Sequence, residues 1–384
     1  MNCHDTVARP PGLNRRSFLH AAGTAVGTGL FGGCSSPPPP PPPGSDFRGQ
    51  TLTIFVYSGL DKLFQEHFVE PFEAKTGAKV VLDAGWWDSI GKLKASPKGQ
   101  PAYDLVLTDA TQGYPAIKSG MFRQIDFDKV PNHKALAPVA LDNWVAKERY
   151  GVTFHESAMT LVWDRRQVKA EPTGWSDLMR DDFKGKLALY DSFYMSLYTF
   201  ACMKVEADKK PGTAHQAIAD DIGGVLEFAK RERDRVRLWW PTGTKMTQDL
   251  LQGTFAAGNA HSVAVLRTVK EKPEVVGFTT PDADRAFVQL MWVIPADTPN
   301  AELAEVAIDY LLSKDVQAAV AKRGAGTSHA EAAKEVAAQD ADWAKTYPHT
   351  DEQFRAMKYY PYEAYFKDWD RIKKTWEQEI LRKS

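Results

Sequence analysis

Segments with strand character alternate with helical segments along most of the chain after residue 50. Strands are predicted at 51–57, 78–82 and 103–108, and helices at 60–76, 90–93 and 116–121. Because parallel strands are joined by right-handed crossovers, this alternation predicts an α/β fold with mainly parallel sheets. Ligands of such sheets lie beyond the carboxyl ends of the strands. The candidate binding residues at these ends are Tyr57, Ser58, Trp86, Trp87, Asp109, Ala110 and Thr111.

A second set of strands and helices begins near residue 175. The apolar segments 150–155 and 158–163 lead toward it, and further strands are predicted at 187–190 and 236–240. The apolar segment 286–295 is predicted to return to the first sheet, and the last third of the chain is mainly helical. His155 falls where the chain passes from one sheet to the other, which makes it another candidate binding residue.

The beginning of the chain has the order of an export signal. Arg15 and Arg16 are followed by Phe18, Leu19 and a run of small and apolar residues that extends to Gly33. A charged head, an apolar middle and small residues before a cleavage point are typical of such signals, and the paired arginines resemble the twin-arginine type. The apolar run is shorter than the roughly 20 residues that a spanning helix needs. We therefore expect residues 1–34 to act as a signal.

Cys34 follows two glycines and resembles the lipid-attachment cysteine of bacterial lipoproteins. Leu30 stands one position further from this cysteine than the lipoprotein pattern requires, so cleavage to a free periplasmic protein stays open as an alternative. Seven prolines, Pro37 to Pro43, follow. A proline run is an extended helix of about 3.1 Å per residue. Residues 35–50 are therefore predicted to be a tether that holds the folded part away from a membrane.

The remaining composition bounds the function. About 350 of the 384 residues remain after the signal, which is too many for one hydrophobic core and suggests two lobes. Lys and Arg number 48 against 49 Asp and Glu, and the signs are interspersed, so no basic surface for nucleic acid is expected. With Cys3 in the signal and Cys34 acylated, Cys202 is the one free cysteine expected; its neighbours are apolar, and it is predicted to be a core residue.

Six short motifs occur in an order that resembles the extracellular solute-binding proteins of ABC importers, in particular the spermidine/putrescine-binding and ferric-binding branch. They are YDLV at 103–106, WSDL at 175–178, FKGK at 183–186, LQGTFA at 251–256, VIP at 293–295 and AIDYLLSKDVQ at 307–317. The resemblance implies two α/β lobes of the periplasmic binding protein type (type II-like). Each lobe then has a mixed, mainly parallel sheet flanked by helices, and crossing strands at 154–157 and 276–279 form a hinge.

The expected domain limits follow from that resemblance. Residues 51–155 with 282–345 form lobe 1, and 156–281 with 346–384 form lobe 2. The resemblance also transfers binding positions. Asp191 matches a family carboxylate and Trp240 an aromatic wall, while Tyr194 and His261 replace a carboxylate and a tryptophan of the polyamine binders. Thr242, just after Trp240, completes the expected site.

The kind of solute is inferred from the positions at which this chain differs from the polyamine binders. With fewer anions than a polyamine binder, the site is expected to take a polyamine-like amine or another polar, zwitterionic solute. Trp86 and Trp87 have two equal interpretations, as two aromatic walls of the site or as a pair with one ring buried in the core.

The sequence motifs of enzymes, cofactor-binding proteins and metal-binding proteins match this chain less well than the motifs of the solute-binding proteins do. The segment 27–32 matches a dinucleotide fingerprint, but it lies inside the export signal with no strand before it. His155 and Glu156 are a weak candidate acid/base pair, and Tyr359 and Tyr360 a weak candidate for the tyrosine pair of ferric binders. The histidines show no metal-ligand spacing. No cofactor is expected.

These features together predict a monomeric, lipid-anchored periplasmic protein that passes a small solute to an inner-membrane ABC permease without chemistry. Two alternatives stay open. An iron or iron-complex binder or an exported enzyme could use the same fold. A sensor that passes its closed form to a receptor is a further alternative.

Overall fold

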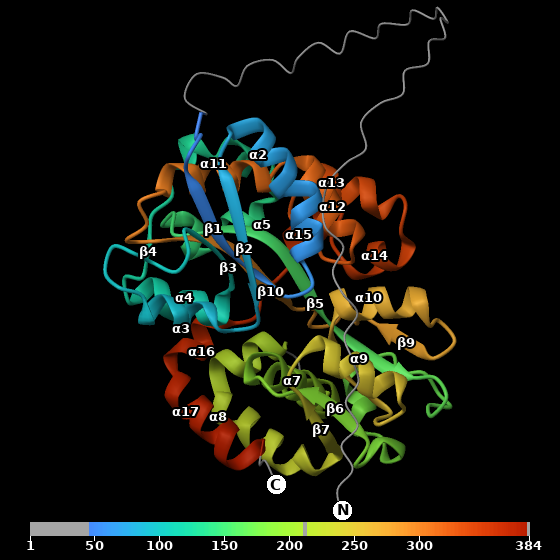
Figure 1. Ribbon diagram of the computed structural model, residues 1–384. Coiled ribbons are helices and arrows are strands. Elements are labelled where there is room, and N and C mark those ends of the chain that lie inside the picture. The colour runs from blue at the N-terminus through green and yellow to red at the C-terminus, as the bar shows by residue number, and fades with distance from the viewer. Residues whose placement is uncertain (1–45, 210–212, 382–384) are drawn as a thin grey trace, which may run out of the picture. The chain divides into compact units, whose positions relative to one another are not determined.

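The computed structural model describes residues 46–209 and 213–381. The export signal, Cys34 and most of the expected tether lie outside these residues. The strands are β1 Thr51–Tyr57, β2 Lys79–Gly85, β3 Leu105–Asp109, β4 Phe122–Arg123, β5 Val152–Asp164, β6 Leu187–Tyr190, β7 Val236–Trp240, β8 Ala257–His261, β9 Val276–Thr279 and β10 Phe287–Pro295. Their order is β2-β1-β3-β10-β5-β8-β6-β7, with β4 beside β10 and β9 beside β5 (Figure 1).

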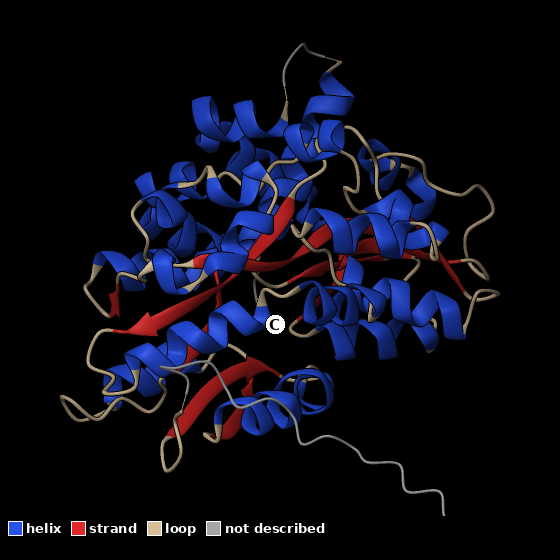
Figure 2. Ribbon diagram, turned by 90° about the horizontal axis from the view of Figure 1, so that it is seen from above, coloured by secondary structure: helices blue, strands red, loops and turns tan. Residues whose placement is uncertain are grey.

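Helices cover the strands on both sides (Figures 1 and 2). In chain order the α-helices are α1 Asp61–Phe64, α2 Glu70–Thr76, α3 Ser89–Ala95, α4 Ala110–Lys118, α5 Pro138–Leu141, α6 Trp144–Lys147, α7 Phe193–Asp208, α8 Ala214–Glu232, α9 Gly243–Leu251, α10 Ser262–Glu271, α11 Ala301–Leu311, α12 Lys314–Lys322, α13 Ala330–Ala337, α14 Ala341–Thr346, α15 Asp351–Ala356, α16 Tyr362–Lys367 and α17 Trp369–Thr375. Single turns of other helix types are η1 Gln65–Val69, η2 Phe127–Lys129, η3 Pro131–Ala135, η4 Trp175–Met179, η5 Asp181–Phe183, η6 Arg233–Arg235 and η7 Trp376–Ile380.

The sheet has two halves that share one long strand. In the first half β1 is parallel to β2 and β3, and β10 runs antiparallel to β3. In the second half β6 is parallel to β7 and β8. The predicted alternation of strands and helices is therefore confirmed in both halves, with antiparallel strands added where they meet.

Strand β5 joins the halves. Residues 152–158 pair with β10, and residues 159–164 pair with β8 and β9. All 13 residues of β5 are buried. The sequence suggested two strands here because His155, Glu156 and Ser157 interrupt the apolar pattern, but a strand that is covered on both faces continues through them. Strand β9, expected as a crossing, instead pairs along the second half of β5.

The chain crosses back between the halves after α15. Helix α15 contacts α5 of the first half, whereas α16 contacts α8 of the second half. Figure 1 shows α16 and α17, in red, on the side of α7 and α8. Between α15 and α16 the segment 358–360 is hydrogen-bonded to the start of β10. The Phe287 amide donates to the Lys358 carbonyl at 3.0 Å, and the Tyr360 amide donates to the Phe287 carbonyl at 3.2 Å.

Helix α7 was not predicted from the sequence. Eleven of its 16 residues are buried, from Phe193 to Met203, so it shows no polar stripe from which a surface helix is recognised. Helix α4 begins at Ala110, six residues before the predicted helix at 116–121. Gly113 and Pro115 disfavour a helix at this place, but the Asp109 side chain caps its N-terminus. Ala110 and Thr111, expected in a loop, are thus the first helical residues.

Strands β6 and β8 approach each other closely at Gly258. A Cβ atom at Gly258 would lie 1.8 Å from the backbone oxygen of Ala188, which cannot move without breaking the sheet. We expect Gly258→Ala to lower the free energy of unfolding by about 3 kcal/mol. The control is Gly91→Ala in α3, where a Cβ meets nothing within 4 Å, and alanine should stabilise by about 0.5–1 kcal/mol. Denaturant titration measures both; equal stability of the two variants would contradict the close approach.

Glu156 lies at the middle of β5 with 2% of its surface exposed. Ser328 donates a hydrogen bond to its carboxylate, and the Tyr359 hydroxyl does so at 3.4 Å. Burial nevertheless raises the pKa of Glu156 to about 7 from its ordinary value of 4.5. The folded state therefore holds a proton that the unfolded state releases between these values. Its stability must fall as the pH rises through this window and level off above it.

We expect the stability difference between the native chain and Glu156→Gln to change by roughly 3 kcal/mol between pH 4.5 and pH 7.5, with the variant gaining at the higher pH. Glutamine has no proton to lose, so the pH-dependent cost disappears. Melting temperatures across this pH range measure the effect, with exposed Glu274→Gln as the control. A difference that stays constant with pH would show that Glu156 keeps an ordinary pKa.

Candidate functional site

A cavity of about 360 Å³, the central cavity, lies where the two halves of the sheet meet. Its walls come from the carboxyl ends of β1 and β3, the middle of β5, the end of β6 and the starts of α9 and α10. The structure brings together nine of the residues proposed from the sequence: Tyr57, Ser58, Trp86, Trp87, Asp109, His155, Tyr194, Thr242 and His261.

Asp109 is the acidic residue of this wall and has 3% of its surface exposed. Its Oδ1 accepts from the amides of Thr111 at 2.7 Å and Gln112 at 3.3 Å, and its Oδ2 accepts from the Tyr57 hydroxyl at 3.0 Å. Burial raises the pKa of Asp109 in spite of these donors. Oδ1 is fully used by the helix cap, whereas Oδ2 keeps a lone pair for one more donor.

Two tryptophans from the loop after β2 stand at the cavity. Trp86 packs edge-to-face on Tyr57 with ring centroids 5.7 Å apart. Trp87 stacks on Tyr194 of α7 with centroids 6.3 Å apart and the planes 12° apart. Both side chains are half-buried. Trp87 therefore reaches from the first half of the molecule to the second, and this corresponds to the interpretation of the pair as aromatic walls.

The backbone of Trp87 is held in an uncommon conformation. Its φ angle is 90°, in a region that costs a non-glycine residue about 1–3 kcal/mol. The Gln112 side-chain amide donates to the Trp87 carbonyl at 3.2 Å, which ties this loop to α4. This strained turn directs the indole ring toward Tyr194.

Two histidines line the cavity and differ in their partners. His155 has 4% of its surface exposed, and neither ring nitrogen has a hydrogen-bond partner among the described residues. The ring of His261 lies 3.4 Å, nitrogen to oxygen, from the Tyr194 hydroxyl. Burial lowers the pKa of each histidine to about 4, so both are neutral at pH 7 and each carries one donor and one acceptor nitrogen.

Four of the proposed residues lie elsewhere. Trp240 is fully buried behind Tyr190, stacked on it with ring centroids 4.3 Å apart, so that Tyr190 is the ring at the cavity. Ala110 is buried at the start of α4. Thr111 and Asp191 line a different, larger cavity of about 1090 Å³, the outer cavity.

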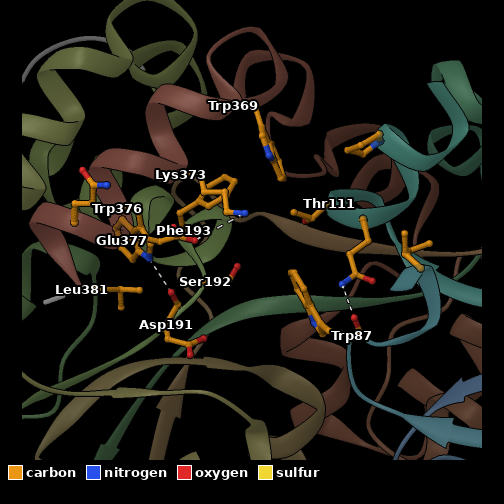
Figure 3. Close-up of a pocket in the computed structure, with 14 residues that line it drawn as sticks. Trp87, Thr111, Asp191, Ser192, Phe193, Trp369, Lys373, Trp376, Glu377 and Leu381 are labelled. Carbon is orange, nitrogen blue, oxygen red and sulfur yellow. Dashed lines mark hydrogen bonds and ion pairs between the residues drawn. The ribbon is translucent and has the colours of Figure 1, made fainter. Parts of the chain in front are cut away.

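The outer cavity lies on the other side of Trp87. Figure 3 shows Trp87 and Thr111 at one side and Asp191, Trp376 and Leu381 at the other. The Trp376 indole donates to the Asp191 carbonyl at 2.7 Å. The family resemblance placed Asp191 in the expected solute site, but the C-terminal turn of the chain packs beside it, and Asp191 lines the outer cavity instead.

Several lining residues of the central cavity were not proposed from the sequence. The polar or charged ones are Ser157, Tyr190, Thr244 and Arg267. Arg267 stands on α10 four residues after Val263, which also lines the cavity, so the two share one helix face. That spacing was readable in the sequence, but the direction of α10 toward the first sheet was not.

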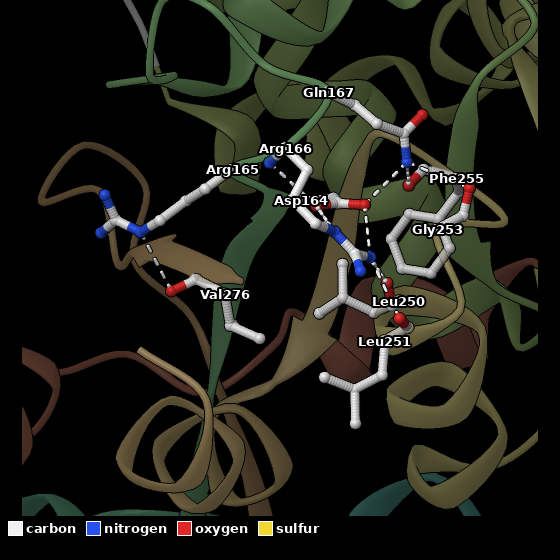
Figure 4. A network of polar contacts seen from close by, with 9 residues as sticks. All are labelled: Asp164, Arg165, Arg166, Gln167, Leu250, Leu251, Gly253, Phe255 and Val276. Atoms are coloured by element: carbon white, nitrogen blue, oxygen red, sulfur yellow. Dashed lines mark hydrogen bonds and ion pairs between the residues drawn. The ribbon is translucent and has the colours of Figure 1, made fainter. Parts of the chain in front are cut away.

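The helix α9 is held at both ends. At its N-terminus the Thr242 hydroxyl accepts from the Lys245 amide. At its C-terminus Arg166 donates to the carbonyls of Leu250 at 3.3 Å and Leu251 at 3.0 Å, and Asp164 at the end of β5 accepts from the same guanidinium at 2.9 Å (Figure 4). This network ties α9 to the strand that the two halves share.

Among residues 46–209 and 213–381, no group of three or more His, Cys, Asp or Glu side chains is arranged to hold a metal ion. No helix in the same part of the chain has the length and apolar character that a membrane span requires. Cys202 is buried in α7, where burial raises the pKa of its thiol, in agreement with the predicted core position.

Comparisons with known proteins agree with this architecture. The chain is 26% identical over 286 residues to the putrescine-binding periplasmic protein PotF of Escherichia coli K12, covering 69% of this chain and 75% of that protein. The Atu4243-GABA receptor is 19% identical with a TM-score of 0.71, covering 87% of this chain and 99% of that one. The binding protein AgtB of A. tumefaciens R10, solved with agropinic acid, is 17% identical with a TM-score of 0.67 and the same coverage.

These structures share the two-lobed α/β fold of periplasmic binding proteins, as the sequence predicted. The model of the bacterial extracellular solute-binding proteins matches residues 67–351. The chain therefore belongs to the bacterial extracellular solute-binding proteins, the substrate-binding components of ABC importers.

Proposed function

We propose that the protein captures a small polar solute that carries an amine, encloses it in the central cavity and delivers it to an ABC permease. The observation that carries this proposal is the cavity itself. It is lined from both halves of the molecule, with Trp86 and Asp109 on one side and Tyr190 and Thr242 on the other. A solute that touches both halves stabilises their closed arrangement, which is the form that a permease receives.

The amine is accommodated by the first half. Asp109 Oδ2 has a lone pair for a donor, and the rings of Tyr57 and Trp86 stand beside it. A buried ammonium group needs an anion and is further stabilised by aromatic faces. The curated relatives that bind putrescine and spermidine support an amine as part of the solute.

Closure rests on a small number of contacts between the lobes. We place lobe 1 at the first half of the sheet and lobe 2 at the second half, with β5, the segment between β9 and β10, and the segment 358–360 as connections. Trp87 of lobe 1 and Tyr194 of lobe 2 stack across the cavity edge. Moving a protein from mostly open to mostly closed takes roughly 5.5 kcal/mol of differential binding. Several hydrogen bonds and stacked rings are enough to supply this.

Export and anchoring follow from the sequence at the beginning of the chain. The paired arginines at 15 and 16 direct the folded chain to the twin-arginine pathway, and Cys34 receives the lipid. Two or more acyl chains hold a protein on a bilayer because each buried CH₂ contributes about 0.8 kcal/mol. The proline tether keeps the lobes away from the surface, so that a monomer reaches its permease in the inner membrane.

Catalysis and iron binding have less support. His155 lines the cavity, but Glu156 is the next residue along a strand and is bonded to Ser328 instead. Successive strand side chains point to opposite faces, so the two cannot act together on one substrate. Tyr359 and Tyr360 do not line the central cavity either. The protein is thus proposed to bind and release its solute unchanged.

We expect Trp87→Ala to weaken solute binding roughly 10- to 100-fold, because the indole is a wall of the cavity and the ring that contacts both lobes. The mature chain from residue 35 is screened by thermal shift against amines, amino acids and their conjugates, since a specific ligand raises the melting temperature by mass action. Calorimetry then measures the affinity of each solute found.

Trp144→Ala is the matched control, because Trp144 is also half-buried but packs on Tyr114 away from both cavities. Its affinity should equal that of the native chain. If no solute of a broad library raises the melting temperature, the proposed function is contradicted. If Trp87→Ala binds normally, the solute site lies elsewhere in the molecule.

A further inference from the structure

Two helices direct their N-termini at the central cavity from lobe 2. Gly243 and Thr244 begin α9, and Val263 and Ala264 lie in the first turn of α10. The two turns are neighbours, since a Cβ atom built on Gly243 would lie 3.5 Å from the Cβ of Ala264. The N–H groups of a first helical turn have no acceptor within the helix and carry partial positive charge. Together they form one electropositive wall.

The side chains around this wall leave its donors free. Thr242 caps α9 but accepts only from Lys245, and His261 at the cap of α10 makes no side-chain bond to that helix. Arg267, on the same helix face as Val263, lines the cavity and has no hydrogen bond or ion pair within the described residues. Such a set of donors is suited to an oxyanion.

His155 provides an independent sign of a missing ligand. It is nearly completely buried at the cavity wall, and neither of its ring nitrogens has a partner in the described part of the chain. Buried polar atoms without partners are rare in folded proteins. A neutral imidazole there is available to donate one hydrogen bond and accept another. It can therefore bond to a solute that carries both a donor and an acceptor.

The charges of the cavity do not match a diamine. Asp109 is the one acidic residue among its described lining residues, and three donors already bond to it. Arg267 adds a positive charge at the opposite side. A solute with two ammonium groups would place one of them against Arg267 and the helix N-termini, where no anion compensates for its lost hydration.

We infer that the solute carries an oxyanion at one end, held by the N-termini of α9 and α10 and by Arg267, and an amine at the other end, directed to Asp109. This inference rests on the proposed function and names its substrate class: a zwitterion of the ω-amino acid type, or the corresponding phosphonate. The lobes therefore recognise opposite charges, and a molecule must have both ends to connect them.

The test compares solutes that differ only in their end groups. Calorimetry with the mature chain measures cadaverine, δ-aminovalerate and glutarate, and their shorter homologues putrescine, γ-aminobutyrate and succinate. We expect the amino acid of at least one length to bind at least tenfold more tightly than the diamine of that length. Aminopropylphosphonate distinguishes a carboxylate site from a phosphonate site.

The variant Arg267→Gln should weaken binding of the amino acid by roughly tenfold or more, because it removes a charged donor to the oxyanion, and should leave diamine binding unchanged or improved. Arg267→Lys should retain part of the affinity. Arg237→Gln is the control, since Arg237 is also an exposed arginine of lobe 2 and lines neither cavity. It should bind as the native chain does.

The outcomes separate this inference from the proposed function. Tighter binding of the diamine, or an amino acid affinity that Arg267→Gln leaves unchanged, overturns the inference while the solute-capturing function stands. If none of these probes binds, the thermal-shift screen of the broad solute library separates the two claims. A solute that binds but carries no oxyanion overturns this inference and leaves the proposed function standing. The absence of any bound solute contradicts both.

Discussion

The structure depends on one strand that belongs to two halves of a sheet. β5 is buried along its whole length and pairs with β10 at its start and with β8 and β9 at its end. Three consecutive polar residues, at 155–157, stand just before the partner changes. His155 and Ser157 line the central cavity, and Glu156 between them is bonded to Ser328. The alternation of side chains along a strand thus separates the groups that face the cavity from Glu156, which bonds to Ser328.

The two lobes contribute different chemistry to the same cavity. The first half of the sheet places Asp109 beside aromatic rings, whereas the second half provides two helix N-termini and Arg267. The polyamine-binding relatives show that one fold serves related solutes, but the fold does not define the charge of the solute. In this chain most of the charged and polar groups that line the cavity lie at strand ends and in the first turns of helices.

The fold class was predictable because local patterns carry it. Alternating strands and helices, such as β1, α2 and β2, have distinct hydrophobic periods that a reader can recognise. Helix α7 was missed because burial on all sides removes its period. The start of α4 was placed six residues too late because Pro115 and Gly113 obscured the cap at Asp109. The strand-end rule placed Tyr57 and Asp109 at the cavity correctly, since parallel strands end at one edge.

The sequence by itself determined the two α/β halves, the family and the strand ends that line the central cavity. Only the tertiary structure decided which side chains meet there. Trp240 ends one strand and Tyr190 its neighbour, yet Tyr190 alone faces the cavity because the two rings stack one behind the other. Asp191 is one residue further and belongs to another space, because the C-terminal turn packs beside it. Such choices depend on contacts between distant segments, which no local pattern encodes.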